Sequence, residues 1–476
     1  MILSLDKQSD LTLHRQICSQ IREMIRSGRL PPGLKLPSTR TLVAEYAVSR
    51  NVFLGAFEQL QAEGYLLSRK GSGTYVSDKI DPALFPAPPE NRNVEKHKRD
   101  YKVHYDFSVG NPDLSEFPLT EWGRCLRKAV SQLKGPEMTY GNPGGTLRLK
   151  RALKKHLLLS RGMNIEEDQL FICSGSHQAL LLAVHSCLDK TEKTAVALEN
   201  PAYNALTRSI IQAGARPLPI LSDDEGISPS HIPAGEDTAM ICVTPSHLFP
   251  TGTVLPIHRR LELCARADEL DCFILENEFE GDLRLKGSQI PSMHFIREER
   301  ILSAGTFSQI MYPAIRLGYL IVPENMISRT ALWYRLLGYG VPVSVQNGMA
   351  LFMEEGLLLR HYRKMKRLYQ EKQEEFITLL KKEFPEELTL RGTDTGTYLC
   401  ASFNGMEFND KTAEILSAAG ITADFEFRHY WPPGTVDKAP GIILGFGNME
   451  NETMEKGVRA LGRAVRSAFQ RQLENH

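Results

Sequence analysis

The residues best suited to chemistry lie in a polar turn within residues 302–319, LSAGTFSQIMYPAIRLGY. An apolar run ends at the hydroxyl side chain of Thr306, and a proline soon follows. This pattern predicts a strand end, a tight turn, and a helix or loop that returns Arg316 toward the turn. Gln309 stands inside the turn. Its amide nitrogen has no nucleophilic lone pair, so it cannot attack a carbonyl compound.

Other polar or aromatic side chains follow apolar runs in the same way. Ser174-Gly175-Ser176 opens an apolar helix directly after such a run. A turn of small residues at that place can hold an anion, because free backbone N–H groups and the helix dipole point at it. Ligand sites in parallel sheets lie at the carboxyl ends of the strands, so one shared site is expected there. The side chains that follow further predicted strands are Tyr203, Asn277 and Phe279.

An α/β domain with a mainly parallel sheet is predicted over residues 105–476. Buried apolar runs alternate there with helical patterns, which is typical of strands joined by helices. The expected strands are residues 170–173, 194–198, 239–243, 272–275, 301–304 and 319–322.

A separate α+β module is predicted over residues 1–78. A helical stripe of apolar residues from 12 to 26 ends at a Pro-Pro-Gly turn. A second helix is expected to begin at Ser38 or Thr39, and a third near Ser49. Residues 65–76 predict two short strands around a glycine-rich turn. Three helices and a hairpin in this order make a winged helix-turn-helix.

The polar residues of this module favour DNA binding. A recognition helix presents its N-terminal residues to base edges, and flanking cations bind phosphate. The module carries ten basic and seven acidic residues, a net charge of +3, whereas the whole chain has a formal net charge of zero. A winged helix used only for protein contacts is the alternative. The candidate DNA-binding residues are Arg40, Ser49, Arg50, Asn51, Arg69, Lys70 and Ser72.

Residues 79–104 differ from both modules and are predicted to form a partly extended, solvated linker. Four prolines lie close together in it and a charged run follows. The eight cysteines include no C-x-x-C pair, so buried free thiols in a reducing cytoplasm are expected and no metal site is predicted. No signal peptide and no membrane span are expected either, because no run of 18 apolar residues occurs.

The first module resembles the DNA-binding domain of the GntR family. The resemblance covers residues 25–76 and rests on the segments GRLPPGLKLPSTR, VSRNV, EGYL and RKGSGTYV. It implies a double-stranded DNA operator as the partner.

The second module resembles the aminotransferase-like domain of the MocR branch of the GntR regulators. Motifs that carry this resemblance include YGNPGG at 140–145, ENPAY at 199–203, TPSH at 244–247, and the polar turn at 302–319. The resemblance implies a fold-type I domain that binds pyridoxal phosphate (PLP), senses it or its amino-acid adducts, and forms a head-to-tail homodimer.

Transferred residue by residue, the resemblance implies a PLP site that is only partly retained. The position of the lysine that would form the Schiff base carries Gln309, the aspartate that would pair with the ring nitrogen is Asn277, and the tyrosine that would reach the ring hydroxyl is Phe279. No lysine lies between Lys286 and Lys364. The retained positions are the phosphate-binding Ser174, Gly175, Ser176, Thr306 and Arg316, the ring-stacking Tyr203, and Tyr140, which reaches a partner's site.

We therefore expect a catalytically inactive, cytoplasmic DNA-binding regulator whose large domain dimerises and senses a small-molecule effector. No covalently bound cofactor is expected. The alternative is a PLP-responsive regulator that binds PLP or a related phosphorylated ligand weakly and non-covalently. The arginine that takes a substrate carboxylate in the family aligns with Ile443, and Arg428 is a possible substitute. The charged helix expected at 357–387 is interpreted as a solvated interdomain helix, with a second nucleic-acid surface as the alternative.

Overall fold

The computed structural model describes residues 2–9, 11–81, 103–139, 141, 143–189, 191–234, 237–338, 340–386 and 388–474. The chain divides into two compact units, residues 1–99 and 100–476. The division falls inside the predicted linker, most of which lies outside the described residues, as does Tyr140.

The first unit has the predicted winged helix-turn-helix fold. Ser38 caps the second helix, since its Oγ accepts a hydrogen bond from the backbone N–H of Thr41 at 3.2 Å. Ala47, in the left-handed conformation at φ 51°, makes the tight turn into the third helix. The elements are α1 (Leu13–Arg26), α2 (Thr39–Tyr46), α3 (Arg50–Ala62), β1 (Leu66–Arg69) and β2 (Gly73–Val76).

An eight-stranded sheet forms the centre of the second unit, as predicted. Its order is β4-β11-β10-β9-β8-β5-β6-β7, and only β11 and the edge strand β7 run against the others. The strands are β4 (Leu170–Cys173), β5 (Ala195–Asn200), β6 (Arg216–Asp223), β7 (Gly226–Ile227), β8 (Thr238–Val243), β9 (Phe273–Glu278), β10 (Ile301–Thr306) and β11 (Gly318–Ile321).

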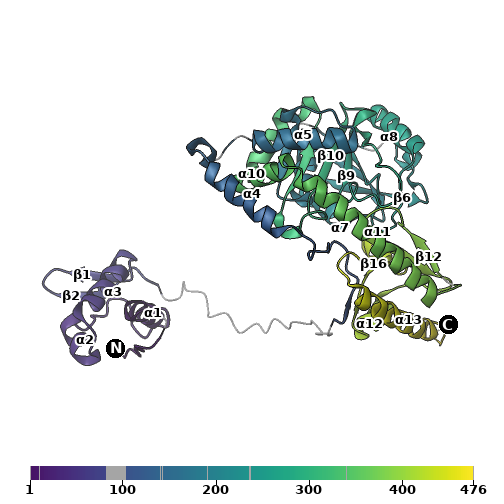
Figure 1. The fold of residues 1–476 in the computed structure, drawn as a ribbon. Coiled ribbons are helices and arrows are strands. Elements are labelled where there is room, and N and C mark those ends of the chain that lie inside the picture. The colour runs from purple at the N-terminus through teal and green to yellow at the C-terminus, as the bar shows by residue number, and fades with distance from the viewer. Residues whose placement is uncertain are drawn as a thin grey trace. The chain divides into compact units, whose positions relative to one another are not determined.

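Helices pack around this sheet. The strands β4 and β8 are buried along their whole length, and β5, β9 and β10 are buried except at their ends, because both faces of the sheet are covered. Figure 1 shows α4, α5 and α10 close together beside the strands β9 and β10. The helices before the C-terminal region are α4 (Leu119–Gln132), α5 (Leu147–Arg161), α6 (Ser176–Leu188), α7 (Asn204–Gln212), α8 (Ile257–Glu269), α9 (Ile327–Leu336) and α10 (Val343–Glu354).

A second, four-stranded sheet in the C-terminal region was not predicted in detail. Its order is β12-β13-β16-β15. The long helix α11 (Leu357–Glu383) runs from beside the large sheet toward this region, where α12 (Asp410–Ala418) and α13 (Asn451–Glu474) also lie (Figure 1). The strands are β12 (Leu388–Arg391), β13 (Tyr398–Phe403), β15 (Asp424–Phe425) and β16 (Gly441–Gly445). The separate pair β3 (Tyr105–Asp106) and β14 (Ile421–Thr422) packs against α12 and α13.

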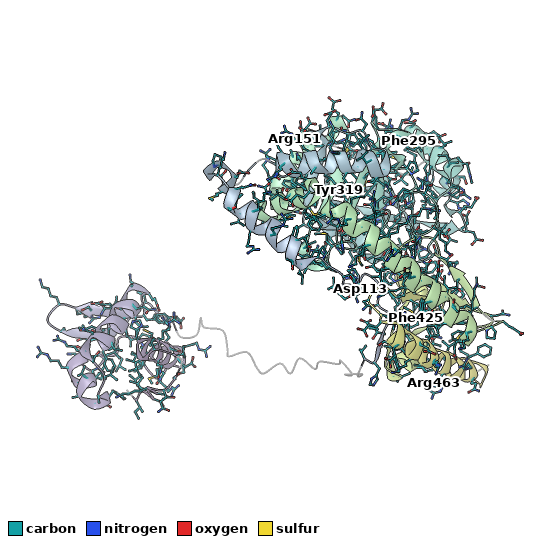
Figure 2. The ribbon with its side chains drawn as sticks, in the orientation of Figure 1. Asp113, Arg151, Phe295, Tyr319, Phe425 and Arg463 are labelled. Carbon is teal, nitrogen blue, oxygen red and sulfur yellow. The ribbon has the colours of Figure 1, made fainter. Side chains whose placement is uncertain are left out.

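One face of helix α11 is buried, and a lysine is buried with it. Lys372, which the sequence places on a solvated helix, is buried instead. Its ammonium group lies 2.7 Å from the carboxylate of Asp113 and donates a hydrogen bond to the carbonyl of Gly447 at 2.9 Å. Figure 2 labels Asp113 below the large sheet. The pair fixes the segment that follows β3 against α11.

All eight cysteines are buried free thiols, which confirms the expectation for them. None of the helices in the described part of the chain combines the length and the apolar character needed to cross a membrane.

Candidate functional site

Seven of the ten predicted site residues of the second unit border one cavity of about 530 Å³. This volume lies within the ~300–1,000 Å³ that is usual for small-molecule sites. Of the other three, Ser174 and Gly175 directly precede the lining residue Ser176, and Tyr140 lies outside the described residues. Strand ends of the large sheet supply Asn277, Phe279, Thr306 and Gln309, and the start of α6 supplies Ser176. The further lining residues that bear on its chemistry are Ser108, Gly110, His177, Tyr203, Phe249, Ser308, Arg316, Asp424 and His429.

One end of the cavity is suited to a phosphate group. Helix α6 starts after Gly175 with no side chain capping its N-terminus. Arg316 crosses directly over this glycine, and its Nη2 donates a hydrogen bond to the carbonyl of Ser174 at 2.8 Å. A side chain at position 175 would place its Cβ 2.6 Å from the same Nη2, so only glycine fits. Backbone N–H groups and a guanidinium therefore meet at this end, which is the arrangement that binds phosphate.

The hydroxyl group of Thr306 is partly engaged within its own turn. It donates to Ser308 Oγ at 3.0 Å and accepts from the Ser308 backbone N–H at 3.2 Å. Just before this turn, Gly305 pairs with Tyr319 of β11, and a side chain at position 305 would overlap the Tyr319 ring. These contacts hold the turn so that Thr306 borders the cavity.

Aromatic side chains form the next part of the wall. The ring of Tyr203 makes edge contacts with His177 and Phe249, at centroid distances of 5.8 and 6.0 Å. Burial lowers the pKa of His177, and the charge of Arg316 lowers it further. Burial raises the pKa of Tyr203, although Arg316 opposes this. Both groups are therefore neutral near pH 7, and a planar ligand ring can lie against uncharged surfaces.

The side chain that strand β9 points into the cavity is the amide of Asn277 and not a carboxylate. Side chains alternate between the faces of a strand, so Asn277 points into the cavity while Glu276 and Glu278 point away from it. Glu276 accepts hydrogen bonds from Ser292 and Ser303, and Glu278 forms a buried ion pair with Arg161 at 2.9 Å. Neither Glu276 nor Glu278 can therefore replace the aspartate that the family resemblance implies at position 277.

Gln309 lines the cavity but is only 9% exposed. Its Oε1 has no hydrogen-bond partner among the described residues. A buried amide oxygen without a donor costs about 1–3 kcal/mol. Rotation of the terminal amide would turn this oxygen toward the cavity, where a ligand donor could reach it. None of the described lining residues is a lysine.

A second candidate site lies on the first unit. All seven predicted DNA-binding residues are exposed, and Ser49, Arg50 and Asn51 form the N-terminal end of α3. Among the described residues neither Arg40 nor Arg50 forms an ion pair, whereas Arg22 and Arg26 are paired with glutamates.

The hairpin adds a rigid cationic tip to this surface. The guanidinium of Arg69 lies 4.7 Å from the ring centre of Tyr75, and the Tyr75 hydroxyl is 2.6 Å from Ser72 Oγ. Lys70 is exposed beside them. Exposed, unpaired cations at the end of a recognition helix and at a wing are suited to phosphate contacts.

Comparisons with known proteins agree with this two-part architecture. The model of the bacterial regulatory proteins of the gntR family matches residues 13–76, and that of aminotransferase class I and II matches residues 103–460. The probable rhizopine catabolism regulatory protein MocR of Rhizobium meliloti is 28% identical over 98% of this chain and 96% of its own. The chain belongs to the MocR subfamily of the GntR regulators.

Two further regulators and one enzyme show the extent of the likeness. The pyridoxine biosynthesis regulator PdxR of Corynebacterium glutamicum and the regulator TauR of Rhodobacter capsulatus are each 29% identical, over 97% and 96% of this chain and 98% and 97% of their own. The multiple substrate aminotransferase of Thermococcus profundus matches with a TM-score of 0.70 at 21% identity, over 82% of this chain and 97% of the enzyme. This last match concerns the fold alone. The MocR-type chain is thus a DNA-binding transcriptional regulator with an aminotransferase-like domain.

The cavity of this MocR-type regulator fits one end of PLP and not the other. The cradle at Gly175 and Arg316 fits the phosphate group. At the ring end, Asn277 offers no charge to hold a protonated ring nitrogen, Phe279 offers no hydroxyl group, and Gln309 cannot form an imine. The cavity therefore does not fit a covalently held PLP.

The structure also shows where the two candidate positions for a carboxylate-binding arginine, Ile443 and Arg428, lie. Ile443 is fully buried in an apolar cluster with Phe249 and Tyr398. Arg428 does not line the cavity; it lies 3.1 Å from Asp410 and packs on aromatic rings. Neither position therefore places an arginine at the cavity among the described residues.

Several lining residues were missed as site residues. His177 directly follows Ser174-Gly175-Ser176, and Phe249 lies two residues beyond the TPSH segment, so a local signal for these two existed. Asp424 and His429 come from the four-stranded sheet region, and nothing in the local sequence marks them.

A buried carboxyl group beneath the Tyr203 loop makes the stability of the domain depend on pH. Burial raises the pKa of Glu199 to about 8, although the backbone N–H of Thr244 donates to it at 2.9 Å and opposes the rise. Between pH 4.5 and 8 the folded state keeps a proton that the unfolded chain has released, so stability falls as pH rises.

Glu199→Gln is expected to reduce the dependence of the domain's stability on pH. Between pH 4.5 and 8, the free energy of unfolding of the wild-type protein should fall by up to about 1.4 kcal/mol per pH unit relative to that of the variant. Thermal and urea unfolding from pH 5 to 9 measure the difference. The exposed Glu192→Gln is the matched control, and equal slopes in all three proteins would contradict the assignment.

Proposed function

We propose that the winged helix of this regulator binds duplex DNA through Arg40, Ser49, Arg50, Asn51, Arg69, Lys70 and Ser72. The observation that supports this most is the set of exposed, unpaired cations at the start of α2, at the start of α3 and at the wing. The N-terminal residues of α3 would enter the major groove, and the wing cations would contact phosphates. A DNA partner places the protein in the cytoplasm.

The large domain, in our proposal, is a catalytically inactive sensor that binds a phosphorylated, ring-bearing effector without a covalent bond. Support comes from the cavity itself, in which a phosphate cradle and an aromatic wall accompany the amide of Gln309, with no lysine among the described lining residues. A second candidate is narrower: the effector is PLP or a close relative. It is favoured by the likeness to PdxR, a regulator of pyridoxine biosynthesis.

We further propose a head-to-tail homodimer, in which Tyr140 reaches the partner's cavity. Exposed apolar side chains on and around α4, α5 and α9 support an interface on this unit. A dimer would present two winged helices to two DNA half-sites. The most exposed apolar side chains of this group are Leu119, Met138, Leu159 and Leu336.

Arg316→Gln is expected to weaken the binding of a phosphorylated ring compound at least tenfold. The variant loses a charge-assisted contact worth about 1.5–3 kcal/mol, because glutamine is polar but uncharged and shorter than arginine. Calorimetric titration of the full-length protein with PLP, and with the unphosphorylated pyridoxal, measures the effect. Pyridoxal should bind weakly to both proteins.

The matched control is Arg428→Gln, which alters an arginine outside the cavity lining. It should leave the affinity for PLP unchanged. Equal affinities of the wild-type and Arg316→Gln proteins for PLP would contradict the phosphate cradle.

A further inference from the structure

We infer that the ligand of the cavity carries a primary amine, so that a phosphorylated ring with an aminomethyl group binds in preference to the same ring with a hydroxymethyl or aldehyde group. The inference rests on the proposed function of the cavity as a non-covalent effector site. It concerns binding only, and no bond to the protein is formed or broken.

The first observation is the unsatisfied amide of Gln309. This side chain stands where an amine nucleophile would be needed for covalent binding, and its Oε1 lacks a hydrogen-bond donor. A half turn of the terminal amide exchanges its oxygen and nitrogen, so the oxygen can face the cavity. An ammonium group offers three N–H donors, a hydroxyl group offers one, and an aldehyde offers none. The amine form is the best partner for this oxygen.

The second observation is the carboxylate of Asp424. In the four-stranded sheet Asp424 is paired directly with Ile443, so both side chains lie on the same face. That face borders the cavity, because Ile443 packs with Phe249 and Asp424 itself lines the cavity. The position at which the family resemblance implies an arginine is therefore apolar, and its cross-strand neighbour is acidic.

Asp424 is held in its charged form. Burial raises its pKa, but the ring of His429 at 2.9 Å and the nearby positive charges lower it more, so the net shift is downward. His429 Nε2 lies within hydrogen-bond distance of Oδ2 only, and Oδ1 accepts from the backbone N–H of Phe425 at 2.8 Å. A carboxylate has about four lone-pair sites, so acceptor capacity remains for a cationic donor.

The remaining charges of the described lining agree with this assignment. Arg316 is the one arginine or lysine among the described lining residues, and its side chain belongs to the phosphate cradle. A second anionic group on the ligand would be repelled by the Asp424 carboxylate, and the ring of His429 is already engaged with that carboxylate. A ligand with a phosphate and an ammonium group would meet an opposite charge at Arg316 and at Asp424.

Calorimetric titration of the full-length protein with three probes tests the inference. They are pyridoxamine 5′-phosphate, pyridoxine 5′-phosphate and PLP, which share the ring and phosphate and differ in one substituent. We expect pyridoxamine 5′-phosphate to bind at least tenfold more tightly than the other two. Equal affinities, or tightest binding of PLP, would overturn the inference and leave the proposed effector site standing. Failure of all three probes to bind would overturn both.

Two variants test which residues cause the preference for the amine-bearing ligand. Asp424→Asn should reduce the preference for the amine to less than threefold while leaving the affinity for pyridoxine 5′-phosphate nearly unchanged. Asp410→Asn, which alters an acidic residue of the same region outside the cavity lining, should keep the full preference. Gln309→Met provides a second test if Asp424→Asn unfolds, and it should also reduce the preference. Full preference in every folded variant would refute the assignment to these residues.

Discussion

Arg50→Ala is expected to lower the affinity for operator DNA by two orders of magnitude or more while the dimer stays intact. Arg50 is exposed, unpaired and placed at the first turn of α3. A direct arginine contact contributes about 1–3 kcal/mol, and a two-fold dimer loses it at both half-sites. The effect should therefore be among the largest that one substitution can produce in this protein.

Fluorescence anisotropy with a duplex selected by the wild-type protein from random DNA measures this effect. Arg40→Ala should act in the same direction, and size-exclusion chromatography should show an unchanged oligomer. Arg26→Ala is the control, because Arg26 belongs to the same unit but is paired with Glu23. Wild-type affinity in both the Arg40 and Arg50 variants would exclude this face of the winged helix as the DNA surface.

Gln309→Lys alone is expected to leave the protein without a stable imine to PLP. The new lysine would supply the nucleophile, but Asn277 cannot hold a protonated ring nitrogen and Phe279 cannot bond the ring hydroxyl. The variant that also contains Asn277→Asp and Phe279→Tyr should retain one PLP per subunit. The two added groups are each worth a few kcal/mol, since position 277 is buried and its new group is charged, while position 279 is half-buried.

Borohydride reduction followed by mass spectrometry gives a direct reading of the imine. The triple variant should gain the mass of one reduced PLP per subunit after desalting, and the single variant should gain little. Asn277→Asp with Phe279→Tyr is the matched control, which can bind PLP more tightly but has no lysine to fix it. Complete labelling of the Gln309→Lys protein would show that Asn277 and Phe279 do not limit covalent binding.

The winged helix and the large sheet were predictable because their signals are local. Ser38 caps its helix through a residue three positions away, and the polar residues of the cavity follow buried strands directly. The carboxyl ends of parallel strands meet at one edge of a sheet, so the position in sequence already implied a shared site. This reasoning brought Asn277, Thr306 and Gln309 together correctly.

Residues whose surroundings come from distant parts of the chain were not predictable. Asp424 belongs to a strand of two residues, and it reaches the cavity only through its pairing with β16. Lys372 looked like one more solvated charge on a helix, because its partner Asp113 lies 259 residues earlier in the chain. No local pattern reports such a pairing, and only the folded arrangement reveals it.

The segment from His104 to Gly110 gives the cavity a mechanical connection to the rest of the chain. Its backbone bonds to Gly420 and Gly445, Asp113 and Lys372 anchor it further along, and Ser108 and Gly110 form part of the cavity wall. The same backbone leads, through the predicted linker, toward the winged helix. A ligand that contacts Ser108 and Gly110 would therefore touch the segment that continues into the linker. In the proposed dimer, any effect of DNA binding on the affinity for the effector must be matched by an equal effect of the effector on the affinity for DNA.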